Sequence, residues 1–428
     1  MKPESDIERC RAKALAALKP SRRQLERGLA LHRAFTVVDA FGFGPSPMTR
    51  GIVRRINAAA AAGASQAQVA EMLRDLRWSE PEALEQCVAA WEASGVTAVL
   101  QNAGGEPGTG LSAYAVRLLD FIQRLQPRVT QARSPGGIRA AKPMGRHCVV
   151  LSYNSVPHGP LSSLEAASAP LQAAYDAGVR MMHLAYNRRN LIADGCMERA
   201  DGGLSEFGFD IIRRMNEIGI LVDTSHTGRR STLDAARATT RPIVASHTAC
   251  RAVYDHPRGK TDEEIRAVAD TGGLVGIYQV ASFLGRRANV LTWLDHVDHA
   301  VRVAGAEHVA VASDTGYIAP FPRGSAPCQA LRDAAQPWVK AMAAAAGGPG
   351  APRANLPYSG AWRPEHGLDA SDDERTGTLT WTNWPLFTVG LVTRGYSDRE
   401  IEGIIGGNAL RVLGTARPLP RLRASGRE

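Results

Sequence analysis

Two histidines and one aspartate stand at or directly after three short apolar runs of the chain. His226 and His247 each follow such a run, and Asp314 ends a third one. Neutral imidazole and carboxylate are the ligand types that suit zinc. If the three runs are parallel strands of one barrel, their carboxyl ends lie at the same face and the side chains converge there. The pattern therefore predicts a metal site made of His226, His247 and Asp314.

Each of these residues also has a plainer explanation. A histidine after a strand is more often a hydrogen-bonded structural group than a ligand. Asp314 can equally be the N-cap of a following helix, a common position for aspartate after a strand. Three suitable residues at comparable positions favour the metal site over three unrelated structural roles.

The elements that must position these residues alternate between two kinds. Eight runs of mostly apolar residues are typical of buried parallel strands; they cover residues 36–40, 96–101, 147–152, 179–184, 220–223, 242–246, 273–278 and 308–314. The segments between them have helical periodicity, as in 207–218, whose apolar residues share one face. Eight such units predict an α/β fold, the (β/α)8 TIM barrel. The main alternative is an open doubly wound sheet. That fold typically has a glycine-rich fingerprint after its first strand, and residues 39–45 match this fingerprint poorly.

Four segments divide the chain on this interpretation. Residues 1–31 form an N-terminal helical extension, and residues 32–416 form the barrel. A long insertion at about 315–380 is rich in Pro, Gly and Ala and exceeds an ordinary loop. Residues 417–428 form a basic C-terminal tail.

Composition favours a soluble globular protein of a reducing compartment. The 428 residues are 44% hydrophobic, and no apolar run is long enough to span a membrane. The charged N-terminus lacks a secretory apolar region, and the six cysteines form no CxxC pair. These features predict a cytoplasmic location. The net charge of +9 is interpreted as solvated tails; the alternative, a nucleic-acid partner, lacks a basic groove with interleaved aromatics.

The middle of the chain resembles the membrane (renal) dipeptidase family, the zinc peptidase family M19. Several segments carry the resemblance, in the order in which the family has them: 187–196, 201–208, 222–236, 242–277, 308–317 and 400–413. The clear match covers about 175–314 and the closing helix, and the residues before about 150 match in outline only. The resemblance implies that the chain is a metal-dependent hydrolase barrel of the amidohydrolase-like type. Within the family it would be a divergent, bacterial-type member.

The resemblance also implies roles for single residues. In the family two zinc ions share a bridging glutamate, and the histidines matching His226 and His247 bind one of the ions. The aspartate matching Asp314 handles protons near the metals, which makes Asp314 the predicted catalytic residue. The arginine identified with Arg251 holds the substrate carboxylate. The predicted substrate-binding residues are Arg251, Tyr186, Asn187, Tyr153 and Asn154.

Departures from the family pattern concern the other metal site. Phe41 and Phe43 stand where the first strand should carry a His-x-Asp ligand pair, and phenylalanine cannot bind metal. Residues 151–155 contain no carboxylate where the bridging glutamate is expected. Tyr186 replaces the substrate-binding histidine of the animal enzymes. The expected cofactor is therefore one zinc ion. The alternative is that the protein binds no metal ion.

Three functional interpretations remain open at this point. The first is hydrolysis of a dipeptide or related small amide, carrying a carboxylate, at a single metal ion. The second is another reaction on a modified amino acid or peptide, and the third is a non-catalytic relative that binds a ligand or partner. The family resemblance adds a homodimer as a further expectation.

Overall fold

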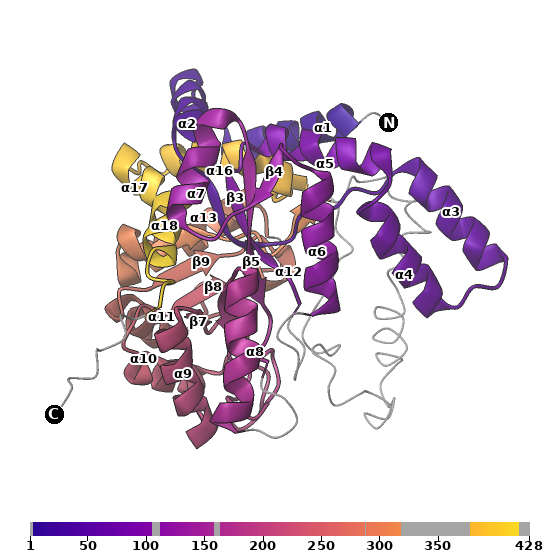
Figure 1. Cartoon of the computed structure of the whole chain (residues 1–428). Coiled ribbons are helices and arrows are strands. Elements are labelled where there is room, and N and C mark those ends of the chain that lie inside the picture. The colour runs from indigo at the N-terminus through magenta and orange to yellow at the C-terminus, as the bar shows by residue number, and fades with distance from the viewer. Residues whose placement is uncertain (1–2, 105–111, 158–162, 287, 318–376, 419–428) are drawn as a thin grey trace, which may run out of the picture.

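Eight parallel strands form a nearly closed barrel at the centre of the molecule (Figure 1). This computed structural model describes residues 3–104, 112–157, 163–286, 288–317 and 377–418. The barrel strands, in spatial order, are β1 (Val38–Gly42), β3 (Ala98–Asn102), β5 (His147–Tyr153), β6 (Val179–His183), β7 (Leu221–Asp223), β8 (Val244–Thr248), β9 (Leu274–Ile277) and β10 (Val309–Val311). Each adjacent pair along this path is parallel. The predicted (β/α)8 barrel is confirmed.

Backbone contacts just beyond β10 join the last strand to the first. The amide of Asp314 donates to the carbonyl of Phe41 at 2.9 Å. Further along, β11 (Gly316–Tyr317) pairs with β2 (Gly44–Pro45). These contacts place the segment after β10 directly against the segment after β1, at the mouth of the barrel.

The barrel interior changes character along its axis. An apolar layer fills the amino-terminal half, with Leu100, Met181, Leu221, Val244 and Leu274 almost fully buried. Two residues further along a strand, the side chain faces the same side again. At that step four strands carry buried polar residues: Ser152, His183, Asp223 and Ser246. The polar layer therefore lies at the carboxyl ends, where barrels of this type place their sites.

Helices cover the outside of the barrel, and most begin at a capping side chain. The covering helices are α5 (Pro81–Ser94), α6 (Ala113–Arg124), α8 (Leu164–Ala177), α9 (Glu206–Ile218), α10 (Arg229–Ala238), α11 (Asp262–Asp270), α13 (Val290–Ala304) and α18 (Asn408–Leu413). In α9, Ser205 caps the first turn and Gly219 ends the helix at φ 93°. A left-handed C-terminal residue of this kind favours glycine. This helix is the one that residues 207–218 predicted.

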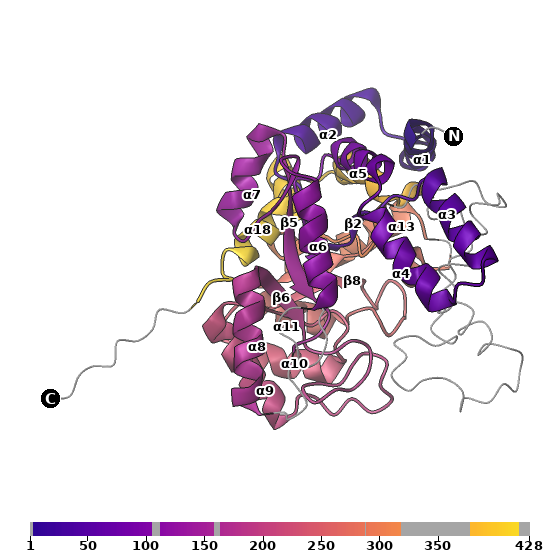
Figure 2. The same cartoon turned by 45° about the vertical axis from the view of Figure 1, so that its right-hand side comes forward.

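The remaining elements surround this core. They are α1 (Pro3–Leu18), α2 (Arg22–Ala34), α3 (Arg50–Ala61), α4 (Gln66–Arg77), β4 (Val129–Gln131), α7 (Pro135–Ala141), α12 (Ala281–Leu284), α16 (Trp384–Thr393) and α17 (Asp398–Glu402), with single turns η1 (Lys142–Met144), η2 (Ala306–His308), η5 (Trp381–Asn383) and η6 (Gly403–Gly407). Figure 2 shows α3 and α4 as a hairpin that projects from the barrel. The three residues of β4 are too few for the apolar pattern to have predicted them. None of the described helices has the length and apolar character needed to cross a bilayer.

Two of the predicted segments, the N-terminal extension and the long insertion, can be compared with the residues that the structure describes. The N-terminal helices continue to Ala34, three residues past the predicted end of the extension. Most of the predicted insertion, residues 318–376, lies outside the described residues.

Candidate metal centre

His226 and His247 face each other at the carboxyl end of the barrel. His247 lies within β8, and His226 lies three residues after the end of β7. Their Nε2 atoms are 2.9 Å apart, and both side chains are buried. The structure thus brings together the two histidines that the sequence singled out.

Ser246 fixes the position of the proton on His247. The Ser246 hydroxyl lies 2.5 Å from Asp223 Oδ2 and 2.8 Å from His247 Nδ1. A carboxylate only accepts hydrogen bonds, so the single hydroxyl proton goes to Asp223. The serine oxygen must then accept a proton from Nδ1. The neutral imidazole therefore has a lone pair on Nε2.

Asn187 fixes His226 in the same way. Its Oδ1 is 2.7 Å from His226 Nδ1, and an amide oxygen can only accept, so Nδ1 carries the proton. Asn187 has φ 62°, and Gly195 packs so closely on it that a Cβ at Gly195 would lie 2.1 Å from the Asn187 carbonyl carbon. A guanidinium donor, Nη2 of Arg258, lies 3.4 Å from His226 Nε2. That contact also requires a lone pair on Nε2.

The two Nε2 lone pairs therefore point toward one another. Burial lowers the pKa of both histidines well below the ordinary value, and the nearby Arg258 charge lowers it further. Both rings are consequently neutral near neutral pH, and no proton is left to lie between them. A tetrahedral ion with nitrogen ligands at 2.0–2.1 Å separates those nitrogens by roughly 3.3 Å. The 2.9 Å separation of the two nitrogens is somewhat shorter than this, so the rings would move slightly apart to hold an ion.

Asp314 stands at the edge of this pair. Its Oδ1 is 3.9 Å from His247 Nε2, and 16% of its side chain is exposed. Burial raises the pKa of Asp314 to about 7, although the charges of Arg258 and His183 act in the opposite direction. Because β11 begins two residues later, Asp314 is not the N-cap of a helix. Its carboxyl group is suited to exchange a proton near neutral pH.

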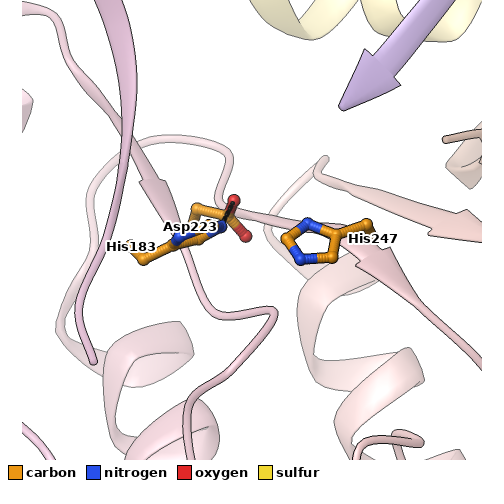
Figure 3. Close-up of side chains that lie close together, drawn as sticks. All are labelled: His183, Asp223 and His247. Carbon is orange, nitrogen blue, oxygen red and sulfur yellow. Dashed lines mark ion pairs between the residues drawn. The ribbon is translucent and has the colours of Figure 1, made fainter. Parts of the chain in front are cut away.

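His183 and Asp223 belong to the same face and were missed in the sequence. Figure 3 shows both side chains beside His247, and each of the three offers a potential ligand atom within 4.8 Å of the others. His183 is fully buried at the end of β6. The signal was present, because Asp223 ends one apolar run and His183 is the next-to-last residue of another.

The surroundings of Asp223 favour a supporting role over metal ligation. Its Oδ1 accepts from Ser225 N, Ser225 Oγ and Ser246 N. Its Oδ2 accepts from the Ser246 hydroxyl and lies 2.7 Å from His183 Nε2. Burial alone would raise the pKa of Asp223, but His183, His247 and Ser246 together lower it. This ionised carboxylate is already surrounded by donors.

Arg258 is the arginine of this site. Its side chain is 1% exposed, and Nη1 donates to the carbonyl of Ser225 at 2.5 Å. Within the part of the chain that the structure describes, no carboxylate oxygen lies within 4.0 Å of its guanidinium. A buried guanidinium whose hydrogen-bond partners are all neutral is suited to bind an anionic group of a ligand.

The prediction that Arg251 faces the pocket is wrong. Its side chain is 45% exposed and its Nε lies 2.6 Å from Asp255 Oδ1, in an ion pair one helical turn apart. That partner holds the guanidinium at the surface. Arg251 and Arg258 follow the same strand, and sequence spacing alone did not reveal which of them turns inward.

Aromatic rings cover both histidines. Phe41 stacks on His247 with ring centroids 4.0 Å apart, and Tyr186 stacks on His226 at the same separation. Phe41 is buried and also lies 5.3 Å from the His183 ring, whereas Phe43 is half-buried. The side of the face where the first metal ligands were expected is thus filled by hydrocarbon.

Two of the predicted substrate-binding residues have other positions. Tyr153 is fully buried in the outer apolar core, and its hydroxyl accepts from the Ser112 amide at the start of α6. Asn187 is fully buried behind His226 and supports that ring. Both corrections follow from the two-residue alternation of strands and from the demand of His226 for an acceptor. Asn154 remains a candidate, with its Oδ1 buried and unpartnered.

Unpartnered buried polar atoms gather on this face. Each lies at or shortly after the carboxyl end of a barrel strand and lacks a hydrogen-bond partner within the described residues; they are Ser152 Oγ, Asn154 Oδ1, His183 Nδ1, Thr227 Oγ1, Arg258 Nε, Gln279 Nε2 and Thr315 Oγ1. Leaving such an atom unpaired costs about 1–3 kcal/mol. Their concentration here indicates a face built to bind a polar ligand.

The fold is a (β/α)8 barrel with buried polar residues at the carboxyl ends of its strands. Within that class, residues 113–333, just over half of the chain, match the family Membrane dipeptidase (Peptidase family M19). The chain belongs to this family.

Single relatives match this chain either over part of its length or at low sequence identity. An uncharacterized dipeptidase of Schizosaccharomyces pombe is 33% identical over 38% of this chain and 42% of its own length. The chain thus matches only about half the length of the curated relatives. The structure of the probable dipeptidase PvdM from Pseudomonas aeruginosa has a TM-score of 0.63 at 18% identity, covering 93% of this chain and 99% of that one. A metallo peptidase from Rhodobacter sphaeroides, liganded with a phosphinate mimic of the dipeptide L-Ala-D-Ala, has a TM-score of 0.58 at 16% identity, covering 89% and 99%.

Proposed function

We propose that this protein is a dipeptidase-like hydrolase that uses a single metal ion, most simply zinc, held by His226 and His247. The observation that carries the proposal is the 2.9 Å approach of two Nε2 atoms whose protons are held on the opposite ring nitrogens. A cation bound by both nitrogens would satisfy the two lone pairs together. Asp314, 3.9 Å from His247 Nε2, is the third group that contacts the ion or its bound water.

The ion would polarise the substrate carbonyl and acidify the attacking water. The other steps belong to side chains of the chain itself. Arg258 binds the carboxylate of the substrate through two parallel N–H donors, which fixes the scissile amide relative to the histidines. Asp314, with a pKa near 7, accepts a proton from the water and passes it to the leaving amine.

A buried arginine and the stacked aromatic rings define the class of substrate. A free carboxylate of the substrate would pair with the buried Arg258 guanidinium, and Phe41 leaves an apolar wall beside His247. Small, carboxylated amides such as dipeptides meet both demands. The phosphinate dipeptide mimic held by the Rhodobacter sphaeroides relative supports this class.

The absence of the other ligands favours one ion over two. Phe41, stacked on His247, and Ser152, the inward-facing residue near the end of β5, contribute no metal ligand to this side. A single ion lacks the second positive charge that would stabilise the tetrahedral intermediate. We therefore expect slower turnover than in two-metal hydrolases. The lack of metal ligands at Phe41 and Ser152 also favours one alternative function. In this alternative the protein binds a carboxylated ligand and does not turn it over.

The test combines metal counting with an activity panel on the full chain. Protein purified without added metal is analysed for bound ions, then assayed on L,L and L,D dipeptides with zinc, manganese or cobalt. One ion per chain with turnover supports the proposal. One ion without turnover of any dipeptide supports the ligand-binding alternative, and two tightly bound ions or none contradict the single-ion site.

A further inference from the structure

We infer that Asp223 is a positioning residue that acts through Ser246 to keep the Nε2 lone pair of His247 directed into the site. The inference rests on the proposed function in one respect, since it assigns that lone pair to a metal ion. It concerns residues that bind neither substrate nor ion. Its basis is the chain of contacts from Asp223 through Ser246 to His247. Figure 3 shows the two ends of this chain, Asp223 and His247.

The proton positions along this chain follow from counting donors and acceptors. Ser246 has one hydroxyl proton, and the 2.5 Å contact assigns it to Asp223 Oδ2. Ser225 also gives its hydroxyl proton to Asp223, at 2.8 Å from Oδ1. Neither serine has a proton left to donate to His247. Nδ1 must therefore be the donor toward Ser246, and the opposite tautomer would leave two unprotonated atoms 2.8 Å apart.

The fold holds this chain of contacts in place. Backbone amides of Ser225 and Ser246 both donate to Asp223 Oδ1 at 3.0 Å. On β9, Gly276 lies so close to Ser246 that a Cβ there would be 1.9 Å from the Ser246 carbonyl oxygen. A glycine is required at that point for β9 to approach β8. His183 Nε2, 2.7 Å from Asp223 Oδ2, is a second contact of that oxygen beside the Ser246 hydroxyl.

Losing the Ser246 hydroxyl would reverse the tautomer preference of the His247 imidazole. Without an acceptor at Nδ1, His247 gains more from placing its proton on Nε2, where the His226 lone pair accepts it at 2.9 Å. That hydrogen bond occupies the position proposed for the metal ion. Supporting partners of metal-binding histidines typically contribute 10–100-fold to metal affinity.

Two serines on the same carboxylate give a matched pair of variants. Ser246→Ala removes a donor to Asp223 and the acceptor of Nδ1. Ser225→Ala also removes a donor to Asp223, but the other contacts of its hydroxyl are the backbone amide of His247, at 2.9 Å, and the Ser246 hydroxyl, at 3.0 Å, and none of them reaches a ring nitrogen. Ser246→Cys keeps a weak acceptor at similar volume, so it serves as the second variant if Ser246→Ala does not fold.

The experiment reads the tautomer and the metal affinity separately. Nitrogen-15 NMR of histidine-labelled, metal-free protein, with His247→Gln used for assignment, reports the tautomer; zinc competition with a chelator reports affinity. We expect the Nδ1–H form in the wild type and in Ser225→Ala. In Ser246→Ala we expect a shift to Nε2–H and a 10–100-fold weaker affinity for zinc, with a smaller shift in Ser246→Cys.

Two outcomes would overturn the inference: an unchanged tautomer in Ser246→Ala and Ser246→Cys, or equal losses of affinity in Ser225→Ala and Ser246→Ala. A wild-type protein that binds no zinc would instead overturn the proposed function. The positioning role would then be judged on the metal-free tautomers alone.

Discussion

The two sides of the barrel mouth differ in what fills them. Around β7 and β8, two histidines are each fixed by a hydrogen-bond partner on Nδ1, and a buried carboxylate supports one of them. Around β1, Phe41 stacks on His247 and Phe43 packs against Phe41 with ring centroids 6.0 Å apart. The first side is a connected polar network, and the second is hydrocarbon.

This difference teaches that the two sides of the mouth are stabilised by different kinds of interaction. A buried polar network loses more than one hydrogen bond when a single member is changed, so its members depend on one another. The apolar side depends only on volume and shape, which several residues can satisfy. The two sides should therefore respond differently to substitution.

The largest effect is expected from the histidines themselves. His226→Ala and His247→Ala each remove one of two lone pairs, and we expect zinc affinity to fall beyond roughly 100-fold, the upper range for losing a mere supporting partner. Turnover should be lost with it. Chelator competition and the dipeptide assay measure the two. His308→Ala, a half-buried histidine bonded to the Gly273 carbonyl, is the matched control and should leave both unchanged.

The next effect separates the two arginines. Arg258→Lys loses one charge-assisted hydrogen bond to the substrate carboxylate, about 1.5–3 kcal/mol, so KM should rise roughly 10–100-fold. Arg251→Lys changes an exposed ion pair with Asp255 and should leave KM unaltered. Steady-state kinetics on one carboxylated dipeptide decides between them. A raised KM in Arg251→Lys alone would restore the assignment made from the sequence.

The apolar side should respond in stability rather than in affinity. Phe41 is 1% exposed, and its replacement by alanine should lower the free energy of unfolding by about 3 kcal/mol. Phe43→Ala, at a half-buried position, should cost less than half of that. Urea denaturation of metal-free protein gives both values. A larger loss of unfolding free energy in Phe43→Ala than in Phe41→Ala would mean that the β1 side is stabilised mainly by the half-buried ring of Phe43.

Periodicity and strand ends were sufficient to predict the barrel and the two histidines. The eight apolar runs became the eight strands, because buried parallel strands need continuous apolar residues. The Asp223–Ser246 support was not predicted, since its members come from different strands and no spacing connects them. Arg258 was not predicted for a similar reason: the direction of a side chain in a loop depends on its partners, here Asp255 for Arg251 and the Ser225 carbonyl for Arg258.

The last comparison sets two buried aspartates against each other. Asp223 has its pKa lowered by His183 and its serine partners, whereas burial raises the pKa of Asp39 to about 7 despite hydrogen bonds from Ser313 and Trp381. Asp39 lies on β1, two residues before Phe41, and its partners among the described residues include Ser313 and Trp381.

The sign of the Asp39 effect follows from proton counting. Between pH 4 and pH 7 the folded state keeps a proton on Asp39 that the unfolded state has lost. The stability that Asp39 contributes is therefore fully present below pH 4 and declines as pH rises to 7, by up to about 1.4 kcal/mol per pH unit. Asp39→Asn removes the titrating group and should flatten this decline. Denaturation of both proteins in chelator, at pH steps from 4 to 8, isolates Asp39, because the other groups are common to both. Equal slopes in the two proteins would show that Asp39 is ionised throughout, as a carboxylate with several donors around it can be.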